Sequence, residues 1–240
     1  FLYNSGQINE GRAFVYYGSS SGLSTTGNWT GESNQVEAYF GYDVSTAGDV
    51  NGDGYDDVIV SAAIFDNGEP DEGRVFVYYG SSSGLATTAS WTAESNQSGS
   101  AFEFVGTAGD VNGDGYDDVI VGAPYYNNGQ YREGRVYVYF GSTSGLSTTP
   151  DWTIESDQIN ANFGNSVSTA GDVNGDGYDD VIIGAMLFNN GETDEGKAFV
   201  YFGSAAGLLT TPSWTAESNQ LNAWFGFVST AGDVNGDNYA

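Results

Sequence analysis

The chain has 240 residues and a formal net charge of −27, from 32 Asp and Glu against 5 Lys and Arg. So few cations cannot neutralise a phosphate backbone or an anionic bilayer, which argues against nucleic acid and membrane surfaces as partners. No apolar run approaches the roughly 18 residues of a membrane span, so we expect no membrane insertion. The acidic excess does not indicate disorder, because aromatic residues make up 15% of the chain and supply a core.

A nine-residue acidic segment, DVNGDGYDD, recurs along the chain. It occupies Asp49–Asp57, Asp110–Asp118 and Asp172–Asp180, and a fourth copy, DVNGDNYA, begins at Asp233. The copies begin 61, 62 and 61 residues apart. A fixed period of this length indicates a repeat protein in which each unit carries its own acidic loop.

The elements of one unit are clearest from Phe163 onward. The unit begins with a β-branched segment, which is followed by the acidic loop, a continuous apolar run and a polar loop. An aromatic segment, a Gly/Ser/Thr turn and a last short strand complete the unit. We therefore expect strands at Phe163–Gly171, Val181–Ala185, Lys197–Phe202 and Ser213–Ser218. The apolar run Val181–Ala185 is expected to be buried on both faces.

Four short strands per unit without a helical period predict an all-β fold. Antiparallel strands repeating every 60 residues or so are typical of propeller blades. We therefore predict a β-propeller of four-stranded antiparallel blades, with about four blades in this chain. Tandem sandwich domains are the alternative, but they would not repeat one acidic loop at this period. The expected units are 40–101, 102–162, 163–224 and a partial unit 1–39 that residues 225–240 complete.

Cations and Trp residues also recur at fixed places in the unit. Four of the five cations, Arg12, Arg74, Arg135 and Lys197, follow Glu-Gly at the head of the third predicted strand. We interpret them as repeated structural ion pairs, each of small energetic value, rather than as functional cations. One Trp occupies an equivalent position in every unit, namely Trp29, Trp91, Trp152 and Trp214.

The acidic loops have the donor pattern of a Ca²⁺ site. Each loop offers carboxylate or amide oxygens at positions 1, 3 and 5, a backbone carbonyl at position 7 and an Asp at position 9. These oxygen atoms are hard ligands, which favour Ca²⁺. Position 6 holds Gly or Asn, which tolerate a left-handed backbone. The predicted ligands are Asp49, Asn51, Asp53, Tyr55 and Asp57; Asp110, Asn112, Asp114, Tyr116 and Asp118; Asp172, Asn174, Asp176, Tyr178 and Asp180; and, in an incomplete fourth site, Asp233, Asn235 and Asp237.

Two helical calcium motifs begin in the same way. An EF-hand requires Glu at position 12, where this chain has Val60, Val121 or Ile183, and a dockerin loop would be followed by a helix. Asx-turns without any metal are the remaining alternative, which three complete copies disfavour.

Two short elements flank the loops. Phe-Gly stands at Phe40-Gly41, Phe163-Gly164 and Phe225-Gly226, and the second unit has Phe102-Glu103 instead, while Gly-Ala-Pro is intact at Gly122-Ala123-Pro124. With the loops between them, these elements resemble the FG-GAP repeat of integrin α-subunit β-propellers and their bacterial relatives. The resemblance implies calcium loops that join the first and second strands on one face, with ligands on the opposite face. Rings of this family usually have seven blades.

The first and last units are incomplete at one seam. When the units are aligned, Ala240 falls opposite Asp56 and Phe1 falls opposite Ala63. The chain therefore lacks an equivalent of Asp57–Ala62 in this unit. The chain is then a fragment of a larger ring, a trimmed four-unit protein, or a chain whose gap is filled by a strand from another chain. We favour a fragment or trimmed protein, and we expect self-association through the open seam.

We expect a secreted or cell-surface calcium-binding module that binds protein or carbohydrate ligands and is not an enzyme. Loop aromatics on the ligand face are the candidate contacts, although each could equally pack against a blade: Phe65, Tyr125, Tyr126, Tyr131, Phe188, Tyr39 and Trp224. A structural unit of a surface layer or filament is one alternative. A polysaccharide-active hydrolase is another, but the chain has no His or Cys, and its free acids such as Glu69 and Glu192 look solvated.

Overall fold

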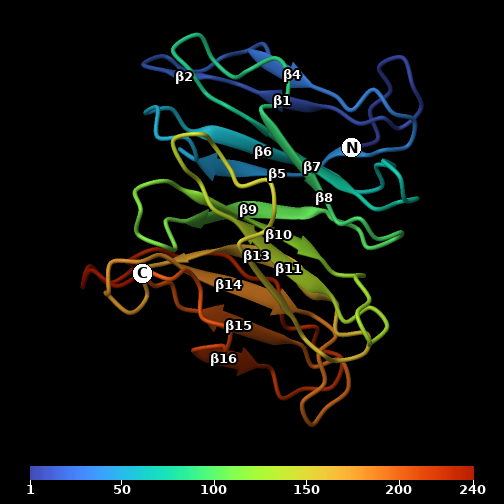
Figure 1. The fold of residues 1–240 in the computed structure, drawn as a ribbon, viewed down its shortest axis with the longest axis vertical. Coiled ribbons are helices and arrows are strands. Elements are labelled where there is room, and N and C mark those ends of the chain that lie inside the picture. The colour runs from blue at the N-terminus through green and yellow to red at the C-terminus, as the bar shows by residue number, and fades with distance from the viewer.

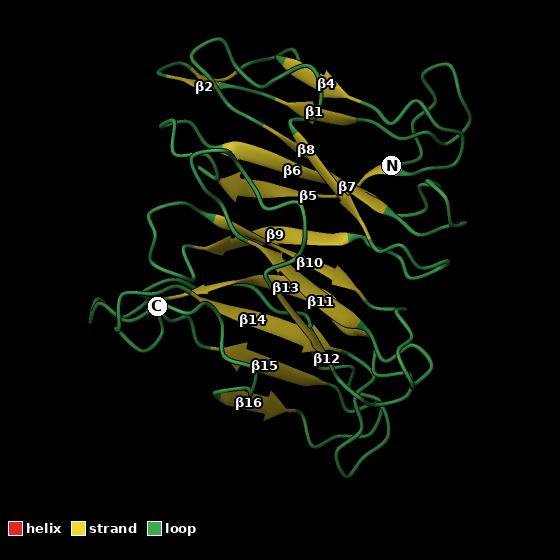
Figure 2. Cartoon of the chain, in the orientation of Figure 1, coloured by secondary structure: helices red, strands yellow, loops and turns green.

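The structure is a computed structural model that describes residues 1–240, and it consists of strands and loops. Its strands form successive antiparallel sheets along the longest axis of the molecule (Figure 1 and Figure 2). The all-β prediction is therefore confirmed. No helix is present that has the length and apolar character to cross a bilayer.

The sheet that begins at Phe163 contains the four strands expected from the sequence. They are β13 (Phe163–Gly171), β14 (Asp180–Ala185), β15 (Lys197–Tyr201) and β16 (Trp214–Glu217), paired in chain order. Strand β14 pairs on both sides and is buried along nearly its whole length, as a continuous apolar run requires.

Two further sheets repeat this order. One contains β5 (Phe40–Gly48), β6 (Asp57–Ala62), β7 (Arg74–Tyr78) and β8 (Trp91–Glu94), and the other contains β9 (Phe104–Gly109), β10 (Asp118–Ala123), β11 (Arg135–Tyr139) and β12 (Trp152–Glu155). The first unit has only the pair β1 (Ala13–Val15) and β4 (Trp29–Gly31), with a small hairpin of β2 (Gly18–Ser19) and β3 (Gly22–Leu23) in a segment expected to be a turn.

The first strands of the three complete sheets, β5, β9 and β13, lie side by side along the inner line of the stack. Strands β5 and β13 have 9 residues and an irregular register after Phe40 and Phe163, whereas β9 has 6. A residue in each irregular segment contacts the next unit. The Asp43 carboxylate accepts a hydrogen bond from the Val105 amide at 3.0 Å, and the Ser166 hydroxyl accepts one from Val228 at 3.1 Å.

Neighbouring units share their hydrophobic cores. Each of the two largest clusters has 14 buried residues drawn from consecutive units, including Trp91 in one and Trp152 in the other. The indole of Trp91 donates a hydrogen bond to the Ser147 carbonyl of the next unit at 2.8 Å, and Trp29 and Trp152 make equivalent bonds. The indole of Trp214 makes no such bond, and 52% of the Trp214 surface is exposed.

Replacing Trp91 with Phe is expected to lower the free energy of unfolding by about 1–3 kcal/mol, because the Ser147 carbonyl loses its donor and the shared core loses part of a buried ring. The matched change Trp214→Phe should alter it by less than about 0.5 kcal/mol, since this indole is half-exposed and makes no such bond. Urea unfolding of both variants measures the difference. Equal losses would show that the bond does not join the units.

The repeated cations form the ion pairs that the sequence predicts. Each pairs with a Glu at the end of the fourth strand of its own unit or directly after it: Arg12 with Glu32 at 3.2 Å, Arg74 with Glu94 at 3.9 Å, Arg135 with Glu155 at 3.2 Å and Lys197 with Glu217 at 3.3 Å. The structural interpretation of these cations is therefore confirmed.

The two ends of the stack are not joined to each other. At one end β1 and β4 pair only with each other, and at the other residues 225–240 contain no strand and lie along the unit 163–224, where the Ala240 amide donates to Asp172. The structure thus contains antiparallel four-stranded sheets in repeating units but no closed ring. Four-blade closure is not confirmed, and the completion of residues 1–39 by residues 225–240 stays a prediction.

Candidate metal-binding loops and the opposite face

The acidic loops join the first and second strands of each sheet, at one end of the inner strands. The C-terminus, which belongs to the fourth copy, marks this side in Figure 1. The connections from the second to the third strand, and from the fourth strand to the next sheet, lie at the opposite end and carry the predicted ligand-face aromatics. This arrangement agrees with the one implied by the FG-GAP resemblance.

Within each loop, the side chains at positions 1, 3 and 5 turn inward and accept hydrogen bonds from loop amides. In the first copy the Asp53 amide donates to Asp49 Oδ1 at 3.0 Å and to Asn51 Oδ1 at 2.9 Å. The amides of Gly54 and Tyr55 donate to Asp49 and Asp53. The other copies repeat these bonds, including the incomplete one at Asp233. The loops are therefore four equivalent tight turns.

The Asp at position 9 is fully buried in all three complete copies: Asp57, Asp118 and Asp180. The carboxylate of Asp118 accepts hydrogen bonds from the Val111 amide at 3.0 Å and the Gly141 amide at 2.9 Å, so it ties the loop to the end of β11. Burial raises the pKa of Asp118 to about 8 and the pKa of Asp57 and Asp180 to about 6, and the carboxylates at positions 5 and 1 act in the same direction.

The donor set fits a hard divalent cation. Each loop holds a buried carboxylate near two further carboxylates, and no Lys or Arg pairs with any of them. A buried charge without a partner is costly, and a bound cation would remove that cost. In no loop, however, do the carboxylate oxygens at positions 1, 5 and 9 all lie within 4.8 Å of one another. The predicted ligands of each site thus lie in one turn, but their carboxylate oxygens are not arranged around a common centre.

The residues at positions 4, 7 and 8 link each loop to the loop of the next unit. The carboxylate of Asp117, at position 8, accepts a hydrogen bond from the Asp49 amide at 2.8 Å, and Asp179 does the same for Asp110. A Cβ atom added to Gly52 would lie 2.5 Å from the ring of Tyr116. No role was predicted for Asp117 or Asp179, although the Asp-Asp pair at positions 8 and 9 is visible in each complete copy.

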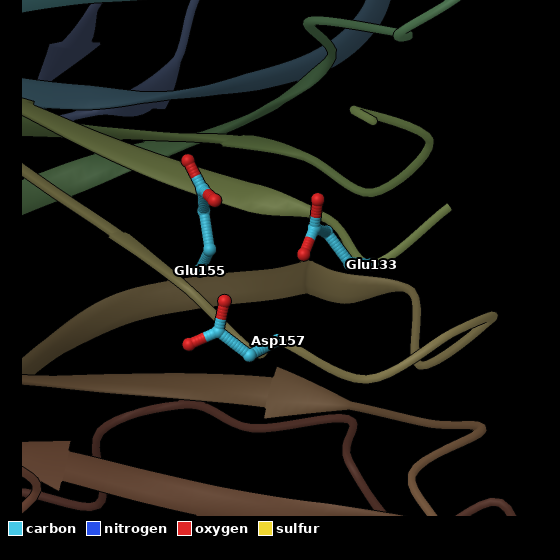
Figure 3. A group of neighbouring side chains, drawn as sticks. All are labelled: Glu133, Glu155 and Asp157. Atoms are coloured by element: carbon cyan, nitrogen blue, oxygen red, sulfur yellow. The ribbon is translucent and has the colours of Figure 1, made fainter. Parts of the chain in front are cut away.

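A different group of acids lies close enough together to hold a metal ion. Carboxylate oxygens of Glu133, Glu155 and Asp157 lie within 4.8 Å of one another, and Figure 3 shows the three side chains. Glu133 precedes β11 and is fully buried, whereas Glu155 ends β12 and already pairs with Arg135. This cluster could hold a metal, but a cation there would lie beside the Arg135 guanidinium.

The buried Glu of this cluster belongs to the repeat. Glu72 and Glu195 occupy the same place in their units, and each also leaves one buried carboxylate oxygen without a partner. Their units have Asn96 and Asn219 where this unit has Asp157. The unpaired oxygen of Glu133 is therefore a property of every complete unit, and it does not single out this group of acids as a site.

The predicted ligand-face aromatics divide into two groups. Phe65, Tyr126 and Phe188 pack edge-on against Phe76, Tyr137 and Phe199 of their own sheets. Tyr131 and Trp224 are each 56% exposed, while Tyr125 and Tyr39 are half-buried. The first group therefore serves packing, and the second remains available on the face.

Glu103 is the point where the second unit departs from the repeat. It replaces the Gly of the Phe-Gly element, is 5% exposed, and receives no hydrogen bond on its carboxyl group. Burial, with a smaller contribution from Asp43, raises its pKa from 4.5 to about 8. Glu103 lines a cavity of about 330 Å³ together with Tyr42 and Tyr125.

The buried Glu103 predicts a pH effect on stability. Between pH 4.5 and 8 the unfolded state loses the Glu103 proton while the folded state keeps it, so the wild type should lose stability relative to Glu103→Gln as the pH rises. Urea unfolding at both ends of this range measures the change. The exposed Glu192→Gln is the control, and parallel curves for the wild type and Glu103→Gln would contradict the burial of this acid.

Comparisons with known proteins agree with the repeat. Residues 40–78, 104–139 and 163–201 match the FG-GAP repeat. Integrin alpha-PS2 of Drosophila melanogaster is 38% identical over 226 residues, which is 88% of this chain and 15% of that protein. Human phosphatidylinositol-glycan-specific phospholipase D is 32% identical over 199 residues, or 76% of this chain and 24% of that protein.

The chain spans less than a quarter of the length of either of these two curated relatives. Among solved structures, an exotype rhamnogalacturonan lyase superposes on 92% of this chain and 39% of its own, with a TM-score of 0.48 and 15% identity. Three matched repeats at the places where the sheets and acidic loops repeat identify the family. The chain belongs to the FG-GAP repeat family and resembles part of an integrin α subunit over most of its length.

Proposed function

We propose that this chain is a calcium-stabilised, extracellular or cell-surface binding module of the β-propeller type. In this proposal Ca²⁺ occupies the acidic loops, and protein or carbohydrate ligands bind the opposite face. The observation that carries it is the threefold repetition of a buried Asp that has no Lys or Arg partner, beside inward-turned Asp and Asn side chains. Similarity to an integrin α subunit supports an adhesive or ligand-binding role.

Calcium would serve structure rather than reaction chemistry. The first site would use Asp49, Asn51, Asp53, the Tyr55 carbonyl and Asp57, and the second and third sites would use the equivalent residues. A bound ion would supply positive charge to carboxylates that lie together in one turn. Because Asp117 and Asp179 connect adjacent loops, ordering one loop also braces the next unit.

Binding is favoured over catalysis by how the cations are used. Four of the five pair with Glu, and the fifth, Arg132, lies 4.6 Å over the ring of Tyr125 and 5.3 Å over that of Tyr131. No cluster of cations is left to hold a phosphate group. Similarity to a phospholipase D therefore does not bring a phosphate site to this chain.

Arrays of glycans and extracellular proteins, probed with the calcium-loaded chain, test the binding role. We expect retention on at least one ligand, and for a protein ligand we expect Trp224→Ala or Tyr131→Ala to weaken it, because these side chains are exposed on the ligand face. Turnover of a polysaccharide by the purified chain, without stable binding, would favour the hydrolase alternative instead.

Exposed apolar side chains at both ends of the stack support a second role, as a unit of a larger assembly. Trp214 and Leu209 are exposed at one end, and Phe14 and Leu23 at the other. The equivalents of Trp214 in the other units are buried against a neighbouring unit. Sedimentation in calcium at increasing concentration tests this, and a monomer at every concentration would exclude self-association.

A further inference from the structure

A cavity of about 330 Å³ opens at the end of the inner strands opposite the acidic loops. Its walls come from all three complete sheets and from the C-terminal segment, through Tyr42, Glu103, Tyr125, Asn165 and Phe227. It therefore lies on the face where the proposed function places ligands. Its volume is at the small end of the range for ligand pockets, which suits a single ring better than a chain.

Two buried polar side chains in this cavity have unused hydrogen-bonding groups. Glu103 is 5% exposed; its carboxyl group receives no hydrogen bond from the protein and reaches the cavity that it lines. Asn165 is 3% exposed; its Oδ1 accepts the Met186 amide at 2.9 Å, but its fully buried Nδ2 has no partner. A buried polar group such as this Nδ2 is rarely left unpaired, because that costs about 1–3 kcal/mol. A ligand in the cavity would supply the missing partners.

The acid at this position is particular to the second unit. The other units have Gly41, Gly164 and Gly226 there, each with a positive φ. A Cβ atom at Gly164 would lie 2.8 Å from a methyl group of Val136. Glu103 has no positive φ, so its backbone accepts a side chain, and that side chain lines the cavity. A carboxyl group therefore occupies this position of the repeat in the second unit alone.

The chemistry of the cavity fits a polyhydroxylated ring. Asn165 Nδ2 is a donor, and a buried carboxyl group that keeps its proton both donates and accepts, as hydroxyl groups require. The nearby carboxylate of Asp43 is occupied by the Val105 and Val44 amides, and it disfavours an anionic ligand. Tyr42 and Tyr125 line the cavity with aromatic rings, and since Arg132 lies over one face of Tyr125, the other face of that ring is left for the carbon face of a sugar.

We propose that this cavity binds one neutral sugar ring, whose hydroxyl groups pair with Glu103 and Asn165. The inference rests on the proposed function of the chain as a binding module, and it names the ligand class and the residues. It assigns the carbohydrate contact to the central cavity rather than to the exposed loop aromatics Tyr131 and Trp224.

Saturation-transfer NMR on the calcium-loaded chain, with a panel of neutral hexoses and N-acetylhexosamines, tests the proposal. At least one sugar should bind the wild type. Glu103→Met keeps the volume of the side chain but not its hydrogen bonds, and it should weaken the affinity for that sugar by about tenfold or more. Glu103→Gly, which restores the residue of the other units, should do the same. Glu192→Met, a change at an exposed acid, should bind as the wild type does.

The melting temperature of each variant in calcium, measured alongside, shows that it is folded. No binding by any sugar of the panel, or equal binding by the wild type and Glu103→Met, would overturn the proposal. Preferential binding of tetramethylammonium would identify a cation site and would also overturn it. The proposed function has a separate test, since a melting temperature that does not respond to EDTA would contradict it. The two tests are independent because Glu103 is not part of an acidic loop.

Discussion

Removing Ca²⁺ with EDTA is expected to lower the melting temperature of the chain by roughly 10 °C. A site with a dissociation constant of about 0.1 mM, in about 1 mM Ca²⁺, adds roughly 1.4 kcal/mol to the free energy of unfolding. Three complete sites add about 4 kcal/mol, and each kcal/mol shifts the melting temperature of a domain of this size by about 2–4 °C. Differential scanning calorimetry in calcium and in EDTA measures the shift.

Two controls make this result specific to calcium. Adding excess Ca²⁺ after EDTA should restore the original melting temperature, and Mg²⁺ should restore less of it, because Mg²⁺ requires a stricter geometry and gives up its water reluctantly. An unchanged melting temperature in EDTA would contradict calcium binding by the loops and would leave them as Asx-turns.

Replacing Asp118 with Ala is expected to lower the free energy of unfolding by about 2–5 kcal/mol. The carboxylate is fully buried and accepts the amides of Val111 and Gly141, so its removal leaves two buried donors without partners. Asp118→Asn keeps an acceptor oxygen and should lose less. Chemical unfolding in calcium and in EDTA separates the two roles of this residue.

In EDTA the loss reports only the hydrogen bonds, and in calcium it also includes the bound ion. The exposed acid Glu192 gives the matched control, and Glu192→Ala should change stability by less than about 0.5 kcal/mol under both conditions. A loss for Asp118→Ala no larger than that of the control would show that the position-9 Asp does not tie the loop to the sheet.

The sequence predicted the elements of one unit closely because each lies between strong local signals. Strand β13 spans the predicted Phe163–Gly171, and β14 begins one residue before the predicted Val181. The acidic loop ends the first strand and the apolar run forces the second to be buried, so both boundaries follow from residues close in sequence. The ion pairs of Arg135 and Lys197 followed in the same way from their repeated position.

Contacts between units could not be predicted from one unit alone. The bond from the Asp49 amide to Asp117 joins residues 68 positions apart, and the one from Trp91 to Ser147 spans 56. The cavity at Glu103 depends on side chains from several sheets, so the sequence showed only a departure from the repeat there. Ring closure depends on how the ends of the stack meet, which no local pattern specifies.

Equilibrium dialysis of the purified chain against ⁴⁵Ca²⁺ tests the central claim most directly. The account predicts three bound ions per chain with similar affinity, and weaker binding at the fourth loop, which keeps Asp233, Asn235 and Asp237 but lacks the last Asp. Substituting Asp110 and Asp114 together with Asn should reduce the count by one. A chain that binds no calcium, or binds it without regard to the second loop, would contradict calcium binding as the role of the repeated DVNGDGYDD segment.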